Sequence, residues 1–347
     1  MIIHPMHETA APALPNQLSA QLAAALAPRL PQGLCALTHL GIIDAQGADA
    51  TVFLQGQLTQ DVALLAPGSS TLAAYCSAKG RMLASFWVYK VEENHFLLLC
   101  SQDLLAATLK RFQMYVLRAK LKLRDVSSEF FTFGLLENSS NSSINLVTNN
   151  PHKTLGVLAI EILKVLGQRR AILLESHTEQ VDPVLQPTLS PHIWAWTEVM
   201  AAVATVTQPV AEAFVPQMLN YESVGGVSFK KGCYPGQEVV ARSQFRGTLK
   251  RRAYLVESNA PMAVGQEVFS PLNPDQACGT VVQAAPRPPE LELVQGQAGN
   301  AESAVGRWNA IVSMQVAAAQ AGGLTLASAT GATLALLPLP YALLDDI

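Results

Sequence analysis

The sequence predicts an α+β protein in which a mixed α/β region is followed by a C-terminal antiparallel β-barrel. Two observations carry this prediction. Between residues 35 and 250, strands of alternating apolar and polar residues are interspersed with helix patterns. After Arg252 the chain changes to short alternating segments separated by Gly, Pro and Asn, a pattern typical of a small barrel of about ninety residues. We therefore expect an N-terminal extension over residues 1–32, a mixed region over 33–250 and the barrel over 251–347.

Length and composition favour a soluble, cytoplasmic protein. The 347 residues exceed the ~100 to 200 typical of one domain. Half of them are apolar and the mean hydropathy is +0.23, yet the longest uncharged apolar stretch, near residues 199–206, is shorter than the ~18 residues of a membrane helix. No secretory signal is evident at the N-terminus. The five cysteines are scattered without a Cys-x-x-Cys pair, so we expect neither a disulfide framework nor a metal site.

The first half of the chain predicts elements that can be justified one by one. Strong helix formers over residues 17–27 indicate a short helix that stops at Pro28. A strand over 35–44 precedes a helix that ends at Gly56, and Thr59 can cap a further short helix over 60–65. Residues 71–90 resemble a β-hairpin with its turn at 77–80, and a strand follows over 95–100.

The middle of the chain predicts a helix from Ser101 to about Leu117, because Leu105, Leu109 and Phe112 fall on one stripe. Basic and apolar residues alternate over 119–125, which indicates a strand with one cationic face. The polar residues 137–153 predict a surface loop, and strands resume over 154–162 and 170–174. Residues 190–198 begin either a helix or an extended segment.

The stretch from Gly226 to Arg252 holds most of the recognisable chemistry. Glycines shape a loop from Gly232 to Gly236, because glycine tolerates positive φ and close approach. A thiol, a phenol, an amide and a carboxylate lie in or beside this loop, and they belong to Cys233, Tyr234, Gln237 and Glu238. Seven basic residues against one acid from Lys230 to Arg252 predict a positive field that attracts an anionic ligand.

These residues resemble a known family. Lys-Gly-Cys-Tyr-x-Gly-Gln-Glu at 231–238, followed by Val-Ala-Arg and Arg-Gly, is similar to the signature of the YgfZ proteins, folate-binding relatives of the glycine-cleavage T-protein. Segments at 55–61, 75–81, 214–220 and 338–341 resemble the family in the same order, so the likeness spans roughly residues 35 to 345. It implies a T-protein-like ring of three domains around a folate site, namely two mixed α/β folate-binding subdomains, interleaved in sequence, and the C-terminal antiparallel β-barrel.

The resemblance also implies a tetrahydrofolate cofactor and assigns residues to it. Trp194 matches the family tryptophan that lies against folate, and Leu40 replaces the family's second such aromatic. A carboxylate can accept hydrogen bonds from the pterin N3–H and 2-amino groups, and an arginine can pair with the glutamate tail. Glu238 and Arg242 supply these types, while Tyr234 and Gln237 are candidates for shaping or contacting the ligand.

Cys233 admits two interpretations. Neighbouring cations, Lys231 among them, and the open N–H groups of a glycine turn would favour a reactive thiolate, which makes Cys233 and Lys231 the candidate catalytic residues. Alternatively, Cys233 is a small buried residue that packs the loop. A change of Cys233 that spared folate binding would separate chemistry from binding.

The resemblance implies a function in iron–sulfur cluster assembly or repair and, through cluster enzymes, in tRNA modification. Iron–sulfur enzymes or assembly proteins, and tRNA, are the implied partners. A folate-dependent one-carbon transferase is the first alternative, although the paired aspartates of T-proteins are replaced by Ala84 and Ser85, which cannot take up a proton. A nonenzymatic RNA-binding adaptor that uses the basic runs at 110–124 and 230–252 is the second.

Overall fold

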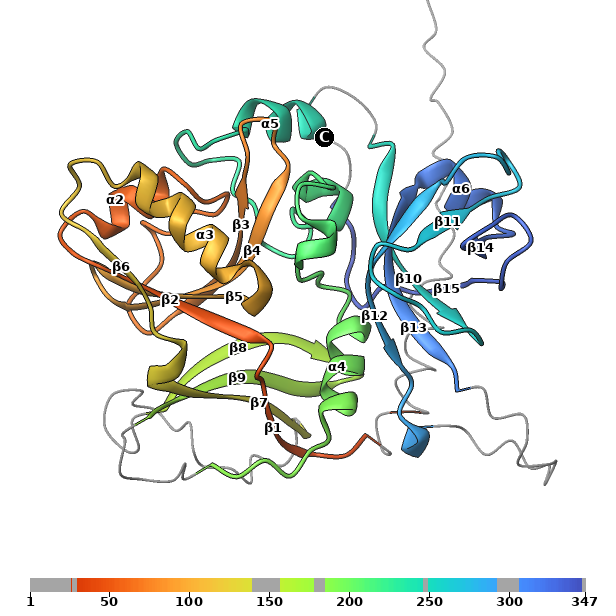
Figure 1. Cartoon of the computed structure of the whole chain (residues 1–347), viewed down its shortest axis with the longest axis horizontal. Coiled ribbons are helices and arrows are strands. Elements are labelled where there is room, and N and C mark those ends of the chain that lie inside the picture. Colours follow the sequence, from red (N-terminus) through yellow and green to blue (C-terminus); the bar gives the residue numbers. More distant parts are fainter. Residues whose placement is uncertain are drawn as a thin grey trace, which may run out of the picture.

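The computed structural model describes residues 26, 30–138, 157–177, 185–245, 249–291 and 306–344, and its strands form three antiparallel sheets (Figure 1). The first sheet has five strands in the order β3 (Ser70–Cys76), β4 (Met82–Glu92), β5 (His95–Ser101), β2 (Leu40–Gln46) and β6 (Lys122–Asp125). The predicted hairpin over 71–90 is confirmed as β3 and β4.

Helices α2 (Ala50–Gln55) and α3 (Gln102–Tyr115) pack on the first sheet. The predicted stripe of α3 is confirmed at Phe112, which is fully buried with its ring centroid 4.5 Å from that of Tyr75. As predicted, α2 ends at Gly56. Burial of the apolar face of α3 provides most of the stability of such a short helix.

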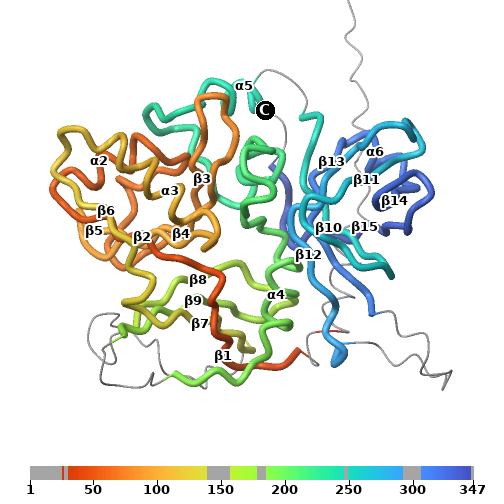
Figure 2. The backbone as a smooth tube through the Cα atoms, in the orientation of Figure 1, coloured from red at the N-terminus to blue at the C-terminus, as the bar shows by residue number. Residues whose placement is uncertain are grey.

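The second sheet has four strands in the order β1 (Gly33–Ala36), β7 (Phe130–Asn138), β9 (Gln168–Ser176) and β8 (Val157–Val165). Strand β1 belongs to this sheet although it precedes every strand of the first, so the chain passes from one sheet to the other and returns at β7 (Figure 2). The two sheets are therefore interleaved in sequence.

The third sheet contains the C-terminal strands and forms a half-barrel. Its order is β14 (Thr325–Leu326), β11 (Glu267–Phe269), β12 (Gly279–Pro286), β13 (Trp308–Gln315), β10 (Arg251–Ser258) and β15 (Ala335–Leu337). The expected closed barrel is thus only partly confirmed. The outer strands β14 and β15 have two and three residues, which is too little for the staggered pairing that would close the sheet. A separate apolar core lies within this part.

Helix α4 (Pro191–Met200) joins the second and third sheets. It begins where expected because Pro191 occupies its first turn and the Ser190 side chain accepts a hydrogen bond from the His192 N–H. Trp196 Nε1 of α4 donates to Asn309 Oδ1 of β13 at 2.8 Å. The helix thereby holds the half-barrel against the mixed region.

Residues 201–221 follow α4 and fill the space between the sheets, as the green tube in the middle of Figure 2 shows. Asn220 adopts a left-handed conformation with φ of 57°, and its side-chain amide donates to Ala253 O of β10 at 2.8 Å. Tyr221 is buried and its hydroxyl donates to Ala204 O at 2.5 Å. Buried polar groups of this segment are therefore bonded to backbone, which fixes its path.

Two short helices are expected from the sequence, one over 60–65 and one over 17–27. The short helix over 60–65 is not present: Thr59 Oγ1 donates to Gly226 O and accepts from the Ala74 N–H, and the Gln55 side chain binds the Val62 N–H. Side-chain hydrogen bonds to backbone thus hold this segment as a loop. The helix predicted over 17–27 and most of the loop over 137–153 lie outside the described residues.

Candidate functional site

The glycine-shaped loop packs against the turn of the β3–β4 hairpin, directly before helix α5 (Gln237–Phe245) at the top of Figure 1. Gly236 has φ of 79°, and a Cβ there would lie 2.4 Å from Ser77 O. A Cβ on Gly80 would lie 2.9 Å from Val239 Cβ. Glycine at both positions lets the two segments touch, since a side chain on either would force them apart.

Lys231 anchors this loop to the end of α2. Its ammonium is buried and donates to Gln55 O and Leu58 O, each at 2.5 Å, and lies 5.0 Å from the centroid of the Tyr234 ring. Burial lowers the pKa of Lys231 to about 8, although the charges of Asp61 and Cys233 oppose this. The amine is thus directed into the protein, where it satisfies backbone carbonyls.

The other residues predicted in this stretch face different surroundings. Cys233 is exposed, which excludes a purely packing role for its side chain. Tyr234 is buried and burial raises its pKa. Gln237 begins α5 and is partly exposed. Glu238, with 83% of its side chain exposed, accepts a hydrogen bond from the Arg242 guanidinium at 2.6 Å. The Glu238 carboxylate therefore lies on the surface.

Trp194 and Leu40 lie elsewhere, so the structure does not bring them together with Glu238 and Arg242. Trp194 is buried on α4, well apart from α5 in Figure 1. Its indole packs on β7, where a Cβ on Gly134 would come within 2.6 Å of the ring. The spacing along the chain could not reveal how far Trp194 lies from α5, because the separation depends on the path that residues 201–221 take between α4 and α5.

Leu40 lines a small inner cavity where the first and second sheets meet α4. Its volume is about 30 Å³, room for one water molecule. The charged side chains at this inner cavity are Arg170 and Glu198, and Trp87 supplies an aromatic side chain. The remaining lining residues are Ile162, Leu163, Ile172, Ala201, Val203 and Thr205.

Arg170 is the unusual group at the inner cavity. It is buried, its guanidinium carbon lies 4.6 Å from the centroid of the Trp194 ring, and its Nε has no hydrogen-bond partner among the described residues. Burial lowers its pKa to about 10, against the charge of Glu198. Sequence reasoning missed this residue. The alternation of β9 did indicate Arg170: neighbouring side chains on a strand point to opposite faces, so one of the two arginines, Arg169 or Arg170, must point inward.

Glu198 is held in place by His39, whose Nε2 lies 3.3 Å from Glu198 Oε1. Burial opposes protonation of His39, but the hydrogen bond and charge of Glu198 outweigh it and raise the His39 pKa. The inner cavity thus presents a carboxylate and a guanidinium side by side, with aromatic and aliphatic side chains around them.

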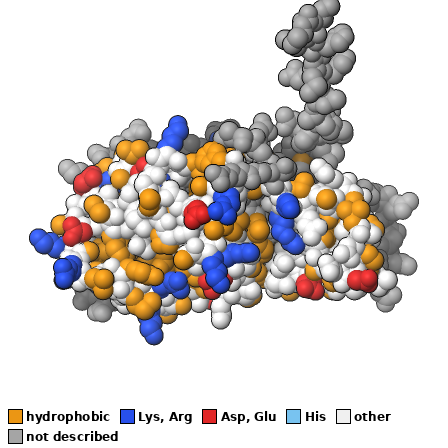
Figure 3. Space-filling view, turned by 90° about the horizontal axis from the view of Figure 1, so that it is seen from above, with side chains coloured by type: hydrophobic (Ala, Val, Ile, Leu, Met, Phe, Trp, Pro, Cys, Tyr) orange, Lys and Arg blue, Asp and Glu red, His pale blue; other side chains and the backbone are white. Residues whose placement is uncertain are grey.

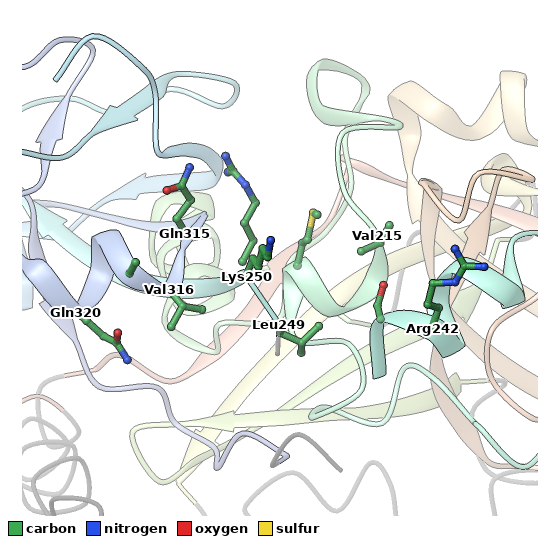
Figure 4. A pocket seen from close by; sticks show the side chains of 11 residues that line it. Val215, Arg242, Leu249, Lys250, Gln315, Val316 and Gln320 are labelled. Atoms are coloured by element: carbon green, nitrogen blue, oxygen red, sulfur yellow. The ribbon is translucent and has the colours of Figure 1, made fainter. Parts of the chain in front are cut away.

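A second, larger hollow separates α5 from the half-barrel. This basic cleft has a volume of about 1050 Å³ and contains Arg242 alone of the predicted site residues. Figure 4 shows Arg242 on one side, Gln315, Val316 and Gln320 on the other, and Leu249 and Lys250 between them. The other lining residues are Val215, Met218, Ser243, Arg251 and Ala317.

The chain is similar in sequence to known proteins. The GCVT N-terminal domain family matches residues 15–169. A tRNA-modifying protein YgfZ of Photorhabdus laumondii is 30% identical over 245 residues, covering 67% of this chain and 74% of that protein. The chain belongs to the YgfZ family. An uncharacterized Haemophilus influenzae protein is 32% identical over 254 residues, which cover 72% of this chain and 82% of that protein.

The fold of this YgfZ family member is that of the aminomethyltransferases. A crystal structure of glycine cleavage system aminomethyltransferase T from Bartonella henselae matches with a TM-score of 0.58 at 14% identity, covering 93% of this chain and 89% of that one. The likeness establishes a mixed α/β fold with several antiparallel sheets.

At the hairpin, Ala84 and Ser85 of this YgfZ family member are both buried on β4. Ser85 Oγ accepts a hydrogen bond from the Val206 N–H at 2.9 Å, so its position is covered by the segment after α4. Neither side chain can exchange a proton near pH 7 as a carboxylate does.

Within the described residues, no group of three or more His, Cys, Asp and Glu side chains is arranged to hold a metal ion. No described helix is long and apolar enough to cross a membrane.

Proposed function

We propose that the protein binds a tetrahydrofolate at the inner cavity and thereby supports the assembly or repair of iron–sulfur enzymes that modify tRNA. The unpaired Arg170 carries the first part of this proposal. A buried guanidinium without an ion-pair partner costs free energy, and such groups concentrate at functional sites where a ligand satisfies them.

The chemistry of the inner cavity complements a pterin edge. That edge presents two donors, N3–H and the 2-amino group, beside one acceptor, the 4-oxo group. Glu198 can accept from the two donors while Arg170 donates to the 4-oxo oxygen, and both are charge-assisted hydrogen bonds of the stronger kind. Trp87 offers an apolar wall for the ring. Glu198 thus takes the role expected for a carboxylate, whereas Arg170 binds the pterin instead of the glutamate tail expected for an arginine.

Entry of the pterin requires movement, because the cavity of about 30 Å³ holds only one water molecule. The segment that carries Ala201, Val203 and Thr205 forms one wall and is the element that would move outward. If folate binds only such an open form, its apparent affinity falls in proportion to the fraction of protein molecules in that form. Folate should therefore change the rate of hydrogen exchange in this segment.

The tRNA part of the proposal is supported by relatives whose name is tRNA-modifying protein YgfZ, in Photorhabdus laumondii and in Vibrio vulnificus. The iron–sulfur part rests on the family resemblance of residues 231–238. We assign the contact with client enzymes to Cys233, since its thiol is exposed, whereas Arg170 of the inner cavity is buried. We also propose an extension over 1–32, two interleaved subdomains over 33–250 and the half-barrel domain over 251–347. The last boundary is supported by β10, which begins at Arg251.

Anaerobic calorimetric titration with tetrahydrofolate tests the folate part. Wild-type protein should bind saturably, and Arg170→Met and Glu198→Gln should each weaken binding by at least tenfold. Arg169→Met is the matched control, because Arg169 lies next along β9 but pairs with Glu137 and Glu161. Equal affinity in Arg170→Met and Arg169→Met would refute the assignment to the inner cavity.

Cellular tRNA modification tests the second part. In cells that lack the protein, wild type should restore a modified nucleoside made by an iron–sulfur enzyme, while Cys233→Ala should not, although it binds tetrahydrofolate normally. Restoration by Cys233→Ala would exclude its thiol from the function.

A further inference from the structure

The basic cleft is distinguished by charge of one sign. Arg242, Lys250 and Arg251 line it, and its lining includes no acidic residue. Among the described residues, neither Lys250 nor Arg251 forms an ion pair with a carboxylate. Arg242 pairs with Glu238, but both side chains are mostly exposed, and such a pair contributes little and can yield to a stronger anion.

Neutral groups complete the walls of the basic cleft. Val316 and Gln320 of α6 (Val316–Ala321) and Gln315 at the end of β13 lie opposite α5 (Figure 4). Val215, Met218 and Leu249 add an apolar surface. The face seen from above shows Lys and Arg side chains gathered near its middle, beside hydrophobic ones (Figure 3). The cleft therefore suits a ligand with an anionic part and a flat, partly polar part.

The volume of about 1050 Å³ leaves room for a ligand larger than an inorganic anion, since it reaches the upper end of the ~300 to 1,000 Å³ of ordinary ligand pockets. Guanidinium and ammonium groups bind phosphate by charge-assisted hydrogen bonds. Glutamine amides donate to and accept from base edges. No carboxylate is present to accept from the donors of a pterin, which separates this cleft from the inner cavity.

We propose that the basic cleft binds a nucleoside phosphate, either free or as one nucleotide of an RNA chain. Arg242, Lys250 and Arg251 bind the phosphate, Gln315 and Gln320 contact the base edge, and the apolar side chains cover the base. This site is independent of folate binding at the inner cavity.

Two binding experiments test the proposal. The first follows the fluorescence anisotropy of a labelled, unmodified tRNA transcript, with AMP as competitor. The second is a calorimetric titration with AMP alone. The double variant K250Q/R251Q should weaken binding at least tenfold and reduce the slope of log K against log salt by about 1 to 2, as expected for one or two lost phosphate contacts. The control K164Q/R307Q removes the same charge from exposed positions on β8 and directly before β13, outside both basic runs, and should retain binding within about twofold.

The ligand arms separate the two sources. AMP binding with displacement of tRNA assigns the cleft to any nucleotide. Binding of tRNA alone assigns it to RNA, and binding of AMP alone assigns it to a free nucleotide. Each result supports the proposal if K250Q/R251Q weakens the binding at least tenfold. Equal losses in both double variants, or binding of neither ligand, would overturn it. Displacement of the nucleotide by tetrahydrofolate would also overturn it, whereas R170M should leave nucleotide binding unchanged.

Discussion

The guanidinium of Arg170 lies over the indole ring of Trp194, 4.6 Å from the ring centroid, and both side chains are buried. A desolvated cation–π contact of this kind is worth about 2 kcal/mol. Trp194 therefore acts as a platform for Arg170 and does not itself offer a face to a ligand. Gly134 makes the arrangement possible, because a side chain there would collide with the indole.

Replacement of Arg170 by methionine should raise stability and abolish folate binding. Removal of the buried guanidinium recovers its desolvation cost of roughly several kcal/mol. The lost cation–π contact and the lost attraction of Glu198 offset most of this gain. We expect a net increase of about 1 kcal/mol in the free energy of unfolding, measured by urea denaturation. A loss of more than about 2 kcal/mol would mean that Arg170 is a structural residue.

Lys231→Met should destabilise the protein by about 2 to 4 kcal/mol, because Gln55 O and Leu58 O would each lose a charged donor. The control is Lys230→Met at the neighbouring exposed position, which should change stability by less than about 0.5 kcal/mol. Thermal and urea unfolding provide the measurement. Equal effects of the two changes would contradict an anchoring role for Lys231.

Gly236→Ala should destabilise by about 3 kcal/mol or more, since a Cβ would meet Ser77 O at 2.4 Å in a backbone with φ of 79°. Gly167 provides a matched comparison, because its φ is 80° but nothing lies within 4 Å of its Cβ position. Gly167→Ala should cost only the left-handed strain of about 1 to 2 kcal/mol. The difference between the two variants measures the contact between loop and hairpin, and no difference would show that the loop can shift.

Much of the fold was predictable because local pattern and burial agree. The hairpin of β3 and β4, the stripe of α3 and the short strands after Arg252 follow from periodicity alone. Closure of the barrel was not predictable, since it depends on the length of β14 and β15 at the sheet edges. Thr59, expected as a helix cap, instead bonds to Gly226 O from a segment remote in sequence.

The sequence named the residue types of a folate site, and their assignment to Glu238 and Arg242 stays a prediction. A carboxylate beside an arginine was expected at Glu238 and Arg242, yet those two lie on an exposed surface of α5. Residues of the same two types line the inner cavity, where Arg170 is buried and the Glu198 side chain is 19% exposed. Sequence could not distinguish them because burial of a charged side chain depends on which sheets pack against it.

Asp44→Asn should flatten the loss of stability in acid. Burial alone would raise the pKa of Asp44, but hydrogen bonds and charges from His95, at 2.7 Å, and Arg124, at 3.1 Å, outweigh it and lower the pKa. A depressed carboxyl pKa adds stability above its unfolded value of about 3.9, and this stability is lost as pH falls through the folded pKa.

At pH 7 the Asp44→Asn variant should therefore be less stable than wild type by about 1 to 3 kcal/mol, and the difference should shrink below about pH 4. Urea denaturation at several pH values measures it, with Asp275→Asn as an exposed control. If the two variants have the same pH profile, the ion pairs of Asp44 do not contribute to acid stability, and other carboxylates must account for it.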